Sequence, residues 1–342
     1  MGLFSKQRLG IDLGTANTII YIENKGIALR EPTLVALSEK TGEAVAFGHE
    51  AAALLGRTSD SYKMIYPIQD GVIANFTVTK QLLAYFITKV VKRSFSKPEV
   101  VICVPSHISK VEHRAVIDAL RELGITRAMI IDEPYAAALG SNLPIQEPKG
   151  RMIIDIGGGT TDVAILSYGE IVTSAMIRHG GNRMNQVIKD AIRDYHKASI
   201  GEATVEEVKQ KIGVALYSPK EDNESDSMLV KGSNIASGIP TEIKITTRFV
   251  ARALNEVIEE IIRTIQQVLE QTPPELAADL IDNGIVLTGG GSLLRRLPER
   301  IQSDIGLPVT LAQTPMDCVA IGAGKTLKQM SIKAKLAEKN SR

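Results

Sequence analysis

Tryptophan is absent from the 342-residue sequence, and aromatic residues together make up only 4% of it. Proteins that bind single-stranded nucleic acids without sequence preference stack the bases on aromatic side chains, so this scarcity argues against that class. An excess of one charge is missing too, because 40 Lys and Arg residues face 39 Asp and Glu residues. A dedicated nucleic-acid-binding protein usually carries a basic excess. We therefore expect no nucleic-acid partner.

Cysteine is scarce as well. Cys103 and Cys318 are the only two, and each lies among apolar neighbours. This number and spacing fit neither a disulfide framework nor a zinc site. We predict two buried free thiols in a reducing cytoplasm.

Long hydrophobic runs are also lacking. No apolar run approaches the ~18 residues that a membrane-spanning helix needs. A secretory signal peptide is not expected either, because residues 5–8 are polar or charged. Hydrophobic residues still make up 44% of the chain. This composition and length predict a globular protein of about two domains.

One unusual pattern occurs twice. Apolar strands are expected over residues 9–11 and 19–22, and an acidic residue and a glycine turn lie between them. The same order of strand, acidic residue, glycine turn and strand returns over residues 152–166. Two copies of such an element predict two similar α/β domains that face each other.

The rest of the chain alternates between helical and strand patterns. Helices are expected over residues 109–122, 133–140, 183–196, 204–215 and 249–269, and strands over 100–104, 128–131 and 284–288. Residues 217–245 are polar and are expected to form a solvated loop, and residues 331–342 a frayed end. Gly324-Lys325-Thr326 resembles the end of a P-loop, but Val319 stands where that motif needs glycine, so we expect a helix there.

Three glycine turns follow expected strands, at Gly14, at residues 157–159 and at residues 289–291. Glycine lets the backbone approach a ligand closely, and the N–H groups of such a turn can point at phosphate oxygens. Asp12 and Asp155 precede the first two turns. Carboxylates beside a polyphosphate are suited to hold Mg²⁺, here through its water shell.

These turns resemble the phosphate-1, phosphate-2 and adenosine motifs of the ATPase superfamily that includes actin, sugar kinases and heat-shock chaperones. Further segments are similar to the MreB-type bacterial actins, the rod-shape-determining proteins. They are Gly10–Thr18, Asp70–Ala74, Glu133-Pro134, Ile200–Thr204, Thr272–Leu276 and Met316–Ala320.

The resemblance implies an α/β, actin-like fold in which two duplicated domains surround a nucleotide cleft, each with a smaller subdomain. The implied boundaries are 1–31, 73–143 and 313–342 for subdomain IA, 32–72 for IB, 144–180 and 245–312 for IIA, and 181–244 for IIB.

The resemblance also implies ATP and Mg²⁺ in that cleft. Asp12 and Asp155 would hold Mg²⁺ through water, and Glu133 would be the catalytic residue that positions the attacking water. The implied nucleotide-binding residues are Gly14, Thr15, Ala16, Asn17, Gly157, Gly158, Gly159, Thr160, Glu206, Lys209, Gly289, Gly290, Gly291 and Ser292. Glu206 and Lys209 also fit an ordinary surface pair one helical turn apart.

The implied function is that of a slowly hydrolysing ATPase that polymerises and supports cell shape. Its partners would be further copies of itself, the inner membrane face and membrane-bound morphogenesis proteins. The alternative is a kinase that phosphorylates a sugar or acetate on the same fold. Such a kinase usually carries large insertions, which this length disfavours.

Membrane attachment has a sequence basis near the N-terminus and at one internal position. Leu3 and Phe4 lie close to basic residues, as does Phe95. Apolar anchors beside cations suit an anionic bilayer surface, so we expect a cytoplasmic protein peripheral to the inner membrane face. A frayed terminus and a surface loop are the alternative interpretation.

Three positions depart from the family pattern. Asn75, Asn182 and Asn185 stand where MreB-type proteins usually carry acidic residues. These changes remove negative charge, two of them near the second domain's nucleotide face. The chain therefore resembles a divergent paralogue whose nucleotide turnover differs from that of the family.

Overall fold

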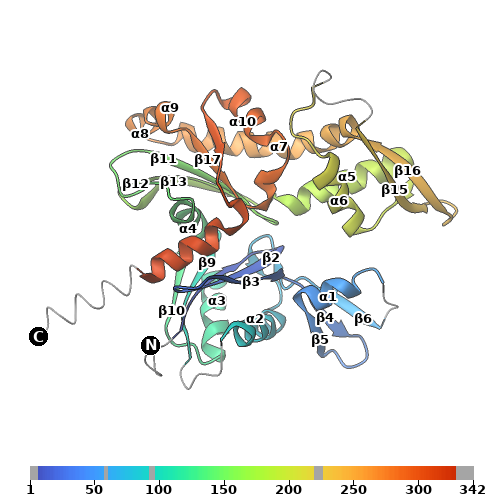
Figure 1. The fold of residues 1–342 in the computed structure, drawn as a ribbon, viewed down its shortest axis with the longest axis horizontal. Coiled ribbons are helices and arrows are strands. Elements are labelled where there is room, and N and C mark those ends of the chain that lie inside the picture. Colours follow the sequence, from blue (N-terminus) through green and yellow to red (C-terminus); the bar gives the residue numbers. More distant parts are fainter. Residues whose placement is uncertain (1–6, 58–60, 92–96, 219–225, 329–342) are drawn as a thin grey trace, which may run out of the picture.

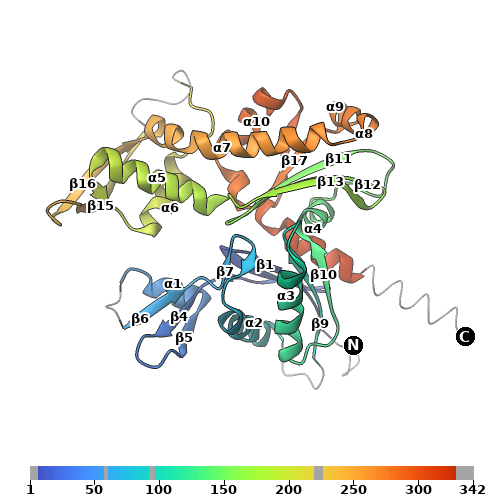
Figure 2. The same ribbon diagram turned by 180° about the vertical axis from the view of Figure 1, so that it is seen from behind.

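The computed structural model describes residues 7–57, 61–91, 97–218 and 226–328. Figure 1 shows two halves, each built on a twisted sheet, with helices packed against both sheets. Figure 2 shows the same halves from behind, with α3 and α2 on the first and α7 along the outside of the second. Among these residues no helix is long and apolar enough to cross a membrane.

The first half is built on a five-stranded sheet with the order β10-β9-β1-β2-β3. Its strands are β1 (Arg8–Leu13), β2 (Asn17–Ile22), β3 (Gly26–Pro32), β9 (Glu99–Val104) and β10 (Ala128–Asp132). The central strand β1 is parallel to β9 and antiparallel to β2. Helices α2 (Phe76–Val90) and α3 (Lys110–Glu122) bury Phe86 and Leu120 in the core of this half. Ser109 and Glu112 form a capping box that begins α3 where the sequence predicts it.

The second half repeats this topology in the order β18-β17-β11-β12-β13. Its strands are β11 (Arg151–Ile156), β12 (Thr161–Ser167), β13 (Glu170–Ile177), β17 (Ile285–Thr288) and β18 (Val309–Leu311). Here β11 takes the central place, parallel to β17 and antiparallel to β12. Helix α7 (Thr247–Glu270) covers this sheet with one apolar face that includes Leu254, Ile258 and Ile265. The predicted duplication is therefore confirmed in the strand pairing itself.

A third core lies between the two sheets. It joins α4 (Glu133–Gly140) to a helix over residues 318–328. The two helices touch so closely that a Cβ on Gly140 would lie 1.8 Å from the Cys318 carbonyl oxygen. Cys103 and Cys318 are buried free thiols, as predicted. The Gly324-Lys325-Thr326 segment is helical, as expected, although its helix begins earlier than the sequence indicates.

Smaller sheets extend from the same side of both halves (Figure 1). On the first half they are formed by β4 (Val35–Ser38), β5 (Ala44–Phe47) and β6 (Tyr62–Ile65) with α1 (Gly48–Leu54), and by the pair β7 (Ile68–Gln69) and β8 (Val72–Ile73). On the second half they are formed by β14 (Ala198–Ser199), β15 (Ser227–Asn234) and β16 (Pro240–Thr246), with α5 (Gly181–His196) and α6 (Glu202–Ile212). The residue boundaries of the four subdomains remain a prediction.

Two sequence-based expectations are wrong. Residues 217–245 are not a loop throughout, because β15 and β16 form an antiparallel hairpin. One face of this hairpin buries Val230, Ile243 and Ile245. These apolar residues alternate with mostly polar ones, so the strand pattern is hard to see in the sequence. Helix α6 ends at Ile212 rather than at residue 215, since Gly213 leaves the helical conformation. Most of the acidic run at 221–226 and all of residues 331–342 lie outside the described residues.

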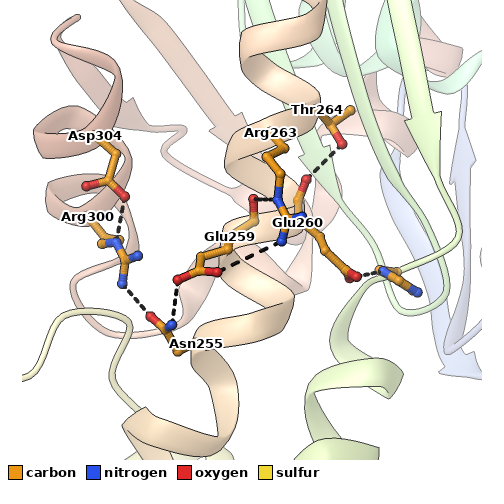
Figure 3. A network of polar contacts seen from close by, with 8 residues as sticks. Asn255, Glu259, Glu260, Arg263, Thr264, Arg300 and Asp304 are labelled. Atoms are coloured by element: carbon orange, nitrogen blue, oxygen red, sulfur yellow. Dashed lines mark hydrogen bonds and ion pairs between the residues drawn. The ribbon is translucent and has the colours of Figure 1, made fainter.

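A polar network fastens the helices of the second half to one another (Figure 3). Arg300 on α10 (Leu297–Ile305) donates to Asn255 on α7 at 3.0 Å and to Asp304 at 2.7 Å. Asn255 in turn donates to Glu259 at 2.7 Å. Arg300 also reaches the Ala215 carbonyl, just beyond α6, at 3.4 Å. The end of α6 is therefore held against α7 and α10.

The remaining short elements connect these parts. They are α8 (Pro274–Ala278), α9 (Leu280–Asn283), the 3₁₀ turn η1 (Gly290–Leu293) and the 3₁₀ turn η2 (Pro315–Asp317).

Candidate nucleotide site

A cavity of about 610 Å³ opens between the two halves. This volume is within the usual range of small-molecule and cofactor sites. Its lining comes from both halves: Asp12, Gly14–Asn17, Ile19, Gly71, Glu133, Asp155, Gly157–Thr160, Gly181, Asn182, Met184, Glu206, Lys209, Gln210, Gly289–Gly291, Leu293–Arg295, Pro315, Met316 and Val319.

The first two glycine turns meet at one edge of this cavity. A Cβ on Gly158 would lie 2.6 Å from the Cβ of Ala16, and one on Gly159 would lie 2.6 Å from the Thr15 hydroxyl. Such contacts are too short for any side chain, so only glycine allows this approach. Thr15 also accepts a hydrogen bond from the Gly71 N–H at 3.0 Å. The backbone amides of both halves therefore line one shared space.

The second turn is fixed by its own backbone and by α5. The Gly157 N–H donates to the Thr160 carbonyl at 2.8 Å. The first residues of α5 donate back to the turn, Gly181 to the Gly157 carbonyl at 2.9 Å and Asn182 to the Gly158 carbonyl at 2.8 Å. A preorganised turn of this kind costs little further ordering when it binds phosphate.

The third turn follows β17. Gly289 has a φ of 82°, in the left-handed region that favours glycine. Ser292 does not line the cavity. Its hydroxyl donates to the Gly289 carbonyl at 2.6 Å, which closes the turn from behind.

Three carboxyl groups line the cavity at the ends of buried elements. Asp12 lies near the end of β1, Asp155 near the end of β11, and Glu133 at the first residue of α4. The parallel topology brings the ends of these strands to the same edge of each sheet, as in other α/β sites. The Asp155 carboxylate accepts a hydrogen bond from the Thr288 hydroxyl at 2.7 Å. Glu133 is buried, with only 7% of it exposed.

Burial acts on all three groups, and neighbouring charges add to its effect on Asp12 and Glu133. Burial, with the charges of Asp155 and Asp317, raises the pKa of Asp12 to about 8. Burial raises the pKa of Asp155 to about 6, although the hydrogen bond from Thr288 opposes this. Burial also raises the pKa of Glu133 well above its ordinary range, and neighbouring carboxylates add to the shift. Each charge is unfavourable without a cation in the cavity.

A fourth carboxylate, Asp162, lies behind this group. Its Oδ1 accepts from the Ser106 N–H at 2.8 Å, which links β12 to the segment after β9. Its Oδ2 is buried and has no hydrogen-bond partner among the described residues. Burial raises the pKa of Asp162 to about 7, and its charge raises the pKa of Glu133 further.

These residues fit a hydrated divalent cation. Within the described residues, no group of three or more His, Cys, Asp or Glu side chains could hold a metal ion directly. Asp12 and Asp155 nevertheless both face the cavity, and their raised pKa values mark an excess of unneutralised charge. Mg²⁺ that keeps most of its waters needs only one or two carboxylates and the phosphates of a ligand.

Another part of the wall combines polar and apolar side chains. Glu206 on α6 accepts from Lys209 at 2.8 Å, so these two form the one-turn pair that the sequence indicates. The pair is not simply a surface feature, because both residues line the cavity and the Lys209 side chain is only 13% exposed. Leu294 and Met316 add apolar side chains to the lining of the same cavity.

The structure brings together nearly all the site residues named from the sequence. Asp12, Glu133, Asp155, Glu206, Lys209 and the three glycine turns line one cavity, and Ser292 supports it from behind. Leu3, Phe4 and Phe95 lie outside the described residues. Sequence reasoning missed Gln210, which follows Lys209 on the same helix, and Asp162, which ends the second glycine motif.

Comparison with known proteins gives one consistent result. A family model described as MreB/Mbl protein matches residues 6–335. Mbl of Bacillus subtilis, named a cell shape-determining protein, is 43% identical over 323 residues, which are 94% of this chain and 96% of Mbl. MreB of Escherichia coli K12, named likewise, is 42% identical over 337 residues, which are 97% and 96% of the two chains. The crystal structure of MreB5 of Spiroplasma citri bound to AMPPNP is 34% identical, with a TM-score of 0.90 over 98% of this chain and 99% of that one.

Proposed function

Because the chain belongs to the MreB/Mbl family, we propose that it is a bacterial actin that binds ATP, hydrolyses it slowly and polymerises into filaments that support cell shape. The observation that carries this proposal is the convergence of three glycine turns and three carboxylates on one interdomain cavity. The MreB5 relative was crystallised with an ATP analogue. The names of the curated relatives supply the role in cell shape.

In this proposal the chain's own groups divide the work. The amides of Gly14–Asn17 and Gly158–Thr160 would hold the phosphates, while the Gly157 N–H closes its own turn, and Asp12 and Asp155 would hold the hydrated cation. Bound Mg²⁺ would neutralise charge on the phosphate oxygens. Glu133 accepts a hydrogen bond from the attacking water and orients it, which suits a reaction that depends mostly on positioning.

The kinase alternative is not favoured. The relatives that match almost the whole chain are named cell shape-determining proteins. A small-molecule kinase would also need a second binding site beside the terminal phosphate for its acceptor. We therefore place water, rather than a sugar or acetate, as the phosphoryl acceptor.

Sedimentation tests the proposal directly. The purified full chain should move into the pellet on addition of ATP and Mg²⁺, and should stay in the supernatant with chelator or without nucleotide. Electron microscopy of the pellet should show filaments. Persistence of monomers alone with ATP, Mg²⁺ and lipid all supplied would overturn the proposal.

We also propose that the filaments lie on the inner membrane face, through Leu3, Phe4 and Phe95 and the basic residues beside them. Insertion of apolar side chains next to cations is favourable at an anionic bilayer. The double variant Phe4→Ser with Phe95→Ser should lose flotation with anionic liposomes but keep ATP-dependent pelleting. Undiminished flotation of this variant would contradict the attachment. Membrane-bound morphogenesis proteins would then bind filaments that are already held at this surface.

A further inference from the structure

The Glu206 carboxylate in the cavity wall accepts three side-chain hydrogen bonds. Its Oε2 accepts from Asn185 at 2.7 Å and from Lys209 at 2.8 Å, and its Oε1 accepts from Gln210 at 2.8 Å. Lys209 also donates to the Gly181 carbonyl at 3.2 Å. Three donors from two helices therefore hold one carboxylate in one orientation.

Asn185 differs from the other two donors, because it comes from α5 and not from the helix that carries Glu206. Its amide N–H₂ donates to Glu206, while its own Oδ1 is buried and has no hydrogen-bond partner among the described residues. Exchange of the amide oxygen and nitrogen would place a carbonyl against the carboxylate, so the contact fixes the orientation of the amide. Within the part of the chain that the structure describes, the polar contact of this side chain is the one to Glu206.

The charge of the side chain at position 185 decides what Glu206 can do. Burial alone would raise the pKa of Glu206, but Lys209, Asn185 and Gln210 together lower it. An Asp at position 185 could not donate unless it were protonated. Two carboxyl groups in this contact would share a proton and titrate as a pair.

We propose that Asn185 is a positioning residue that holds Glu206 oriented toward a hydroxyl of a ribose. A carboxylate that lines a cavity accepts hydrogen bonds from hydroxyl groups, and Glu206, with three of its roughly four lone-pair sites occupied, keeps about one for this purpose. Because Asn185 does not titrate, recognition of the ribose stays constant between pH 6 and pH 8. This inference rests on the proposed binding of ATP.

The experiment compares the affinity for ATP with that for 2′,3′-dideoxy-ATP, which lacks both hydroxyls, in the parent, Asn185→Asp, Glu206→Gln and the double variant. The parent should prefer ATP by about tenfold at both pH 6 and pH 8, since each tenfold step is about 1.4 kcal/mol. Asn185→Asp should lose most of this preference at pH 8 and regain it at pH 6, where the carboxyl pair binds a proton. In the Glu206→Gln background, Asn185→Asp should have no further effect on the preference.

Gln186→Glu is the matched control, because it adds the same charge one residue along α5 on an exposed side chain that contacts Asp190. It should keep the parent's preference at both pH values. Equal loss of ATP and dideoxy-ATP affinity in Asn185→Asp would indicate a merely structural role and would overturn the inference. So would an unchanged preference, an effect that persists without Glu206, or a parent that binds both nucleotides equally. A parent that binds no ATP would instead contradict the proposed function.

Discussion

At the residue scale, the cavity is defined by carboxyl groups that repel one another. Burial raises the pKa values of Asp12, Glu133, Asp155 and Asp162, and neighbouring carboxylates add to the shift for Asp12, Glu133 and Asp162. A protein folded only for stability would avoid such a cluster, because each unpaired buried charge is unfavourable. A cation bound in the cavity would offset this repulsion, and a carboxylate would be available to position a water molecule.

Glu133 should separate binding from chemistry. Glu133→Gln keeps the volume of the buried side chain but removes its charge, so affinity for ATP should stay within a few-fold. Hydrolysis should fall by roughly 10²-fold or more, the usual scale for a positioned base. Nucleotide affinity and phosphate release, measured on Glu133→Gln and Glu133→Ala, give the two numbers.

Glu122→Ala serves as the control. Glu122 is the last residue of α3, is exposed, and forms an ion pair with Lys80 on α2. It should hydrolyse at the parent rate. If both Glu133 variants hydrolyse ATP at the parent rate, another residue positions the attacking water, and Asp162 would be the next residue to test.

Asp12 should make the ligand-free protein less stable as the pH rises. A carboxyl whose pKa is about 8 in the folded chain, against an ordinary 3.8, binds its proton more tightly when folded. Its contribution to stability is complete below the ordinary pKa and is lost as the pH rises toward 8. Asp12→Asn should therefore melt above the parent at pH 8, by on the order of a few degrees, and the difference should shrink toward pH 5.

Thermal unfolding without nucleotide, across that pH range, measures this difference. Asp194→Asn, at an exposed surface carboxylate, should show no such trend. With ATP and Mg²⁺ the order should reverse, because the parent gains stability from binding and the Asp12→Asn variant binds weakly. If the difference in melting temperature does not vary with pH, ionisation of Asp12 does not destabilise the folded protein.

Asp12, Asp155 and Glu133 could be found from the sequence because local order alone places them. Each stands where a buried strand ends or a helix begins. Asp162 could not be assigned in this way, since its importance depends on Ser106, which the fold brings from the other half. The sequence marks Asn185 only by its lack of charge, because its partner Glu206 lies on a different helix.

At the element scale, the two facing glycine turns set how closely the halves approach. Gly158→Ala would place a Cβ 2.6 Å from that of Ala16, so one turn must move away. Affinity for ATP should weaken by at least about tenfold, or about 1.4 kcal/mol, because both turns no longer reach the same phosphates. Titration with a fluorescent ATP analogue measures the loss, and circular dichroism shows whether the fold is kept.

Gly201→Ala is a suitable control, because nothing lies within 4 Å of the added Cβ and φ there is −75°. It should bind ATP as the parent does. If Gly158→Ala also binds normally, the close approach of the turns is not needed for the nucleotide.

Elements with a continuous apolar face can be predicted from the sequence. Elements in which polar residues interrupt the apolar pattern cannot. Helix α7 carries its apolar stripe over its full length and was placed within two residues of its true bounds. The β15–β16 hairpin buries only alternate residues between exposed Lys231, Leu229 and Glu242, so its period was obscured. Helix α6 ends before Gly213, where φ is −67° and ψ is 137° and where an added Cβ would lie 2.2 Å from the Lys209 carbonyl oxygen. The apolar residues that follow made the helix appear longer in the sequence.

At the scale of the whole molecule, duplication explains why the site lies where it does. The two sheets share one topology, and in each the last but one residue of the central strand is an aspartate and a glycine turn follows the strand. The repeated motif predicted this pairing. The close contact of α4 with residues 318–328 could not be predicted, because it joins segments far apart in sequence. A ligand that bridges both turns would bias how the halves sit against each other.

Filament lifetime should depend on this bridge. A heterologous contact that does not close into a ring produces a filament. If the bound nucleotide sets the orientation of the two halves, its cleavage should weaken that contact. Because Glu133→Gln keeps ATP bound but does not cleave it, its filaments should form at the parent's ATP concentration and persist longer. After rapid removal of free ATP, light scattering should decay several-fold more slowly for the variant than for the parent. The parent assembled with a non-hydrolysable ATP analogue should behave like the variant. Equal decay in all three would show that hydrolysis does not control disassembly, even if the filaments themselves form as proposed.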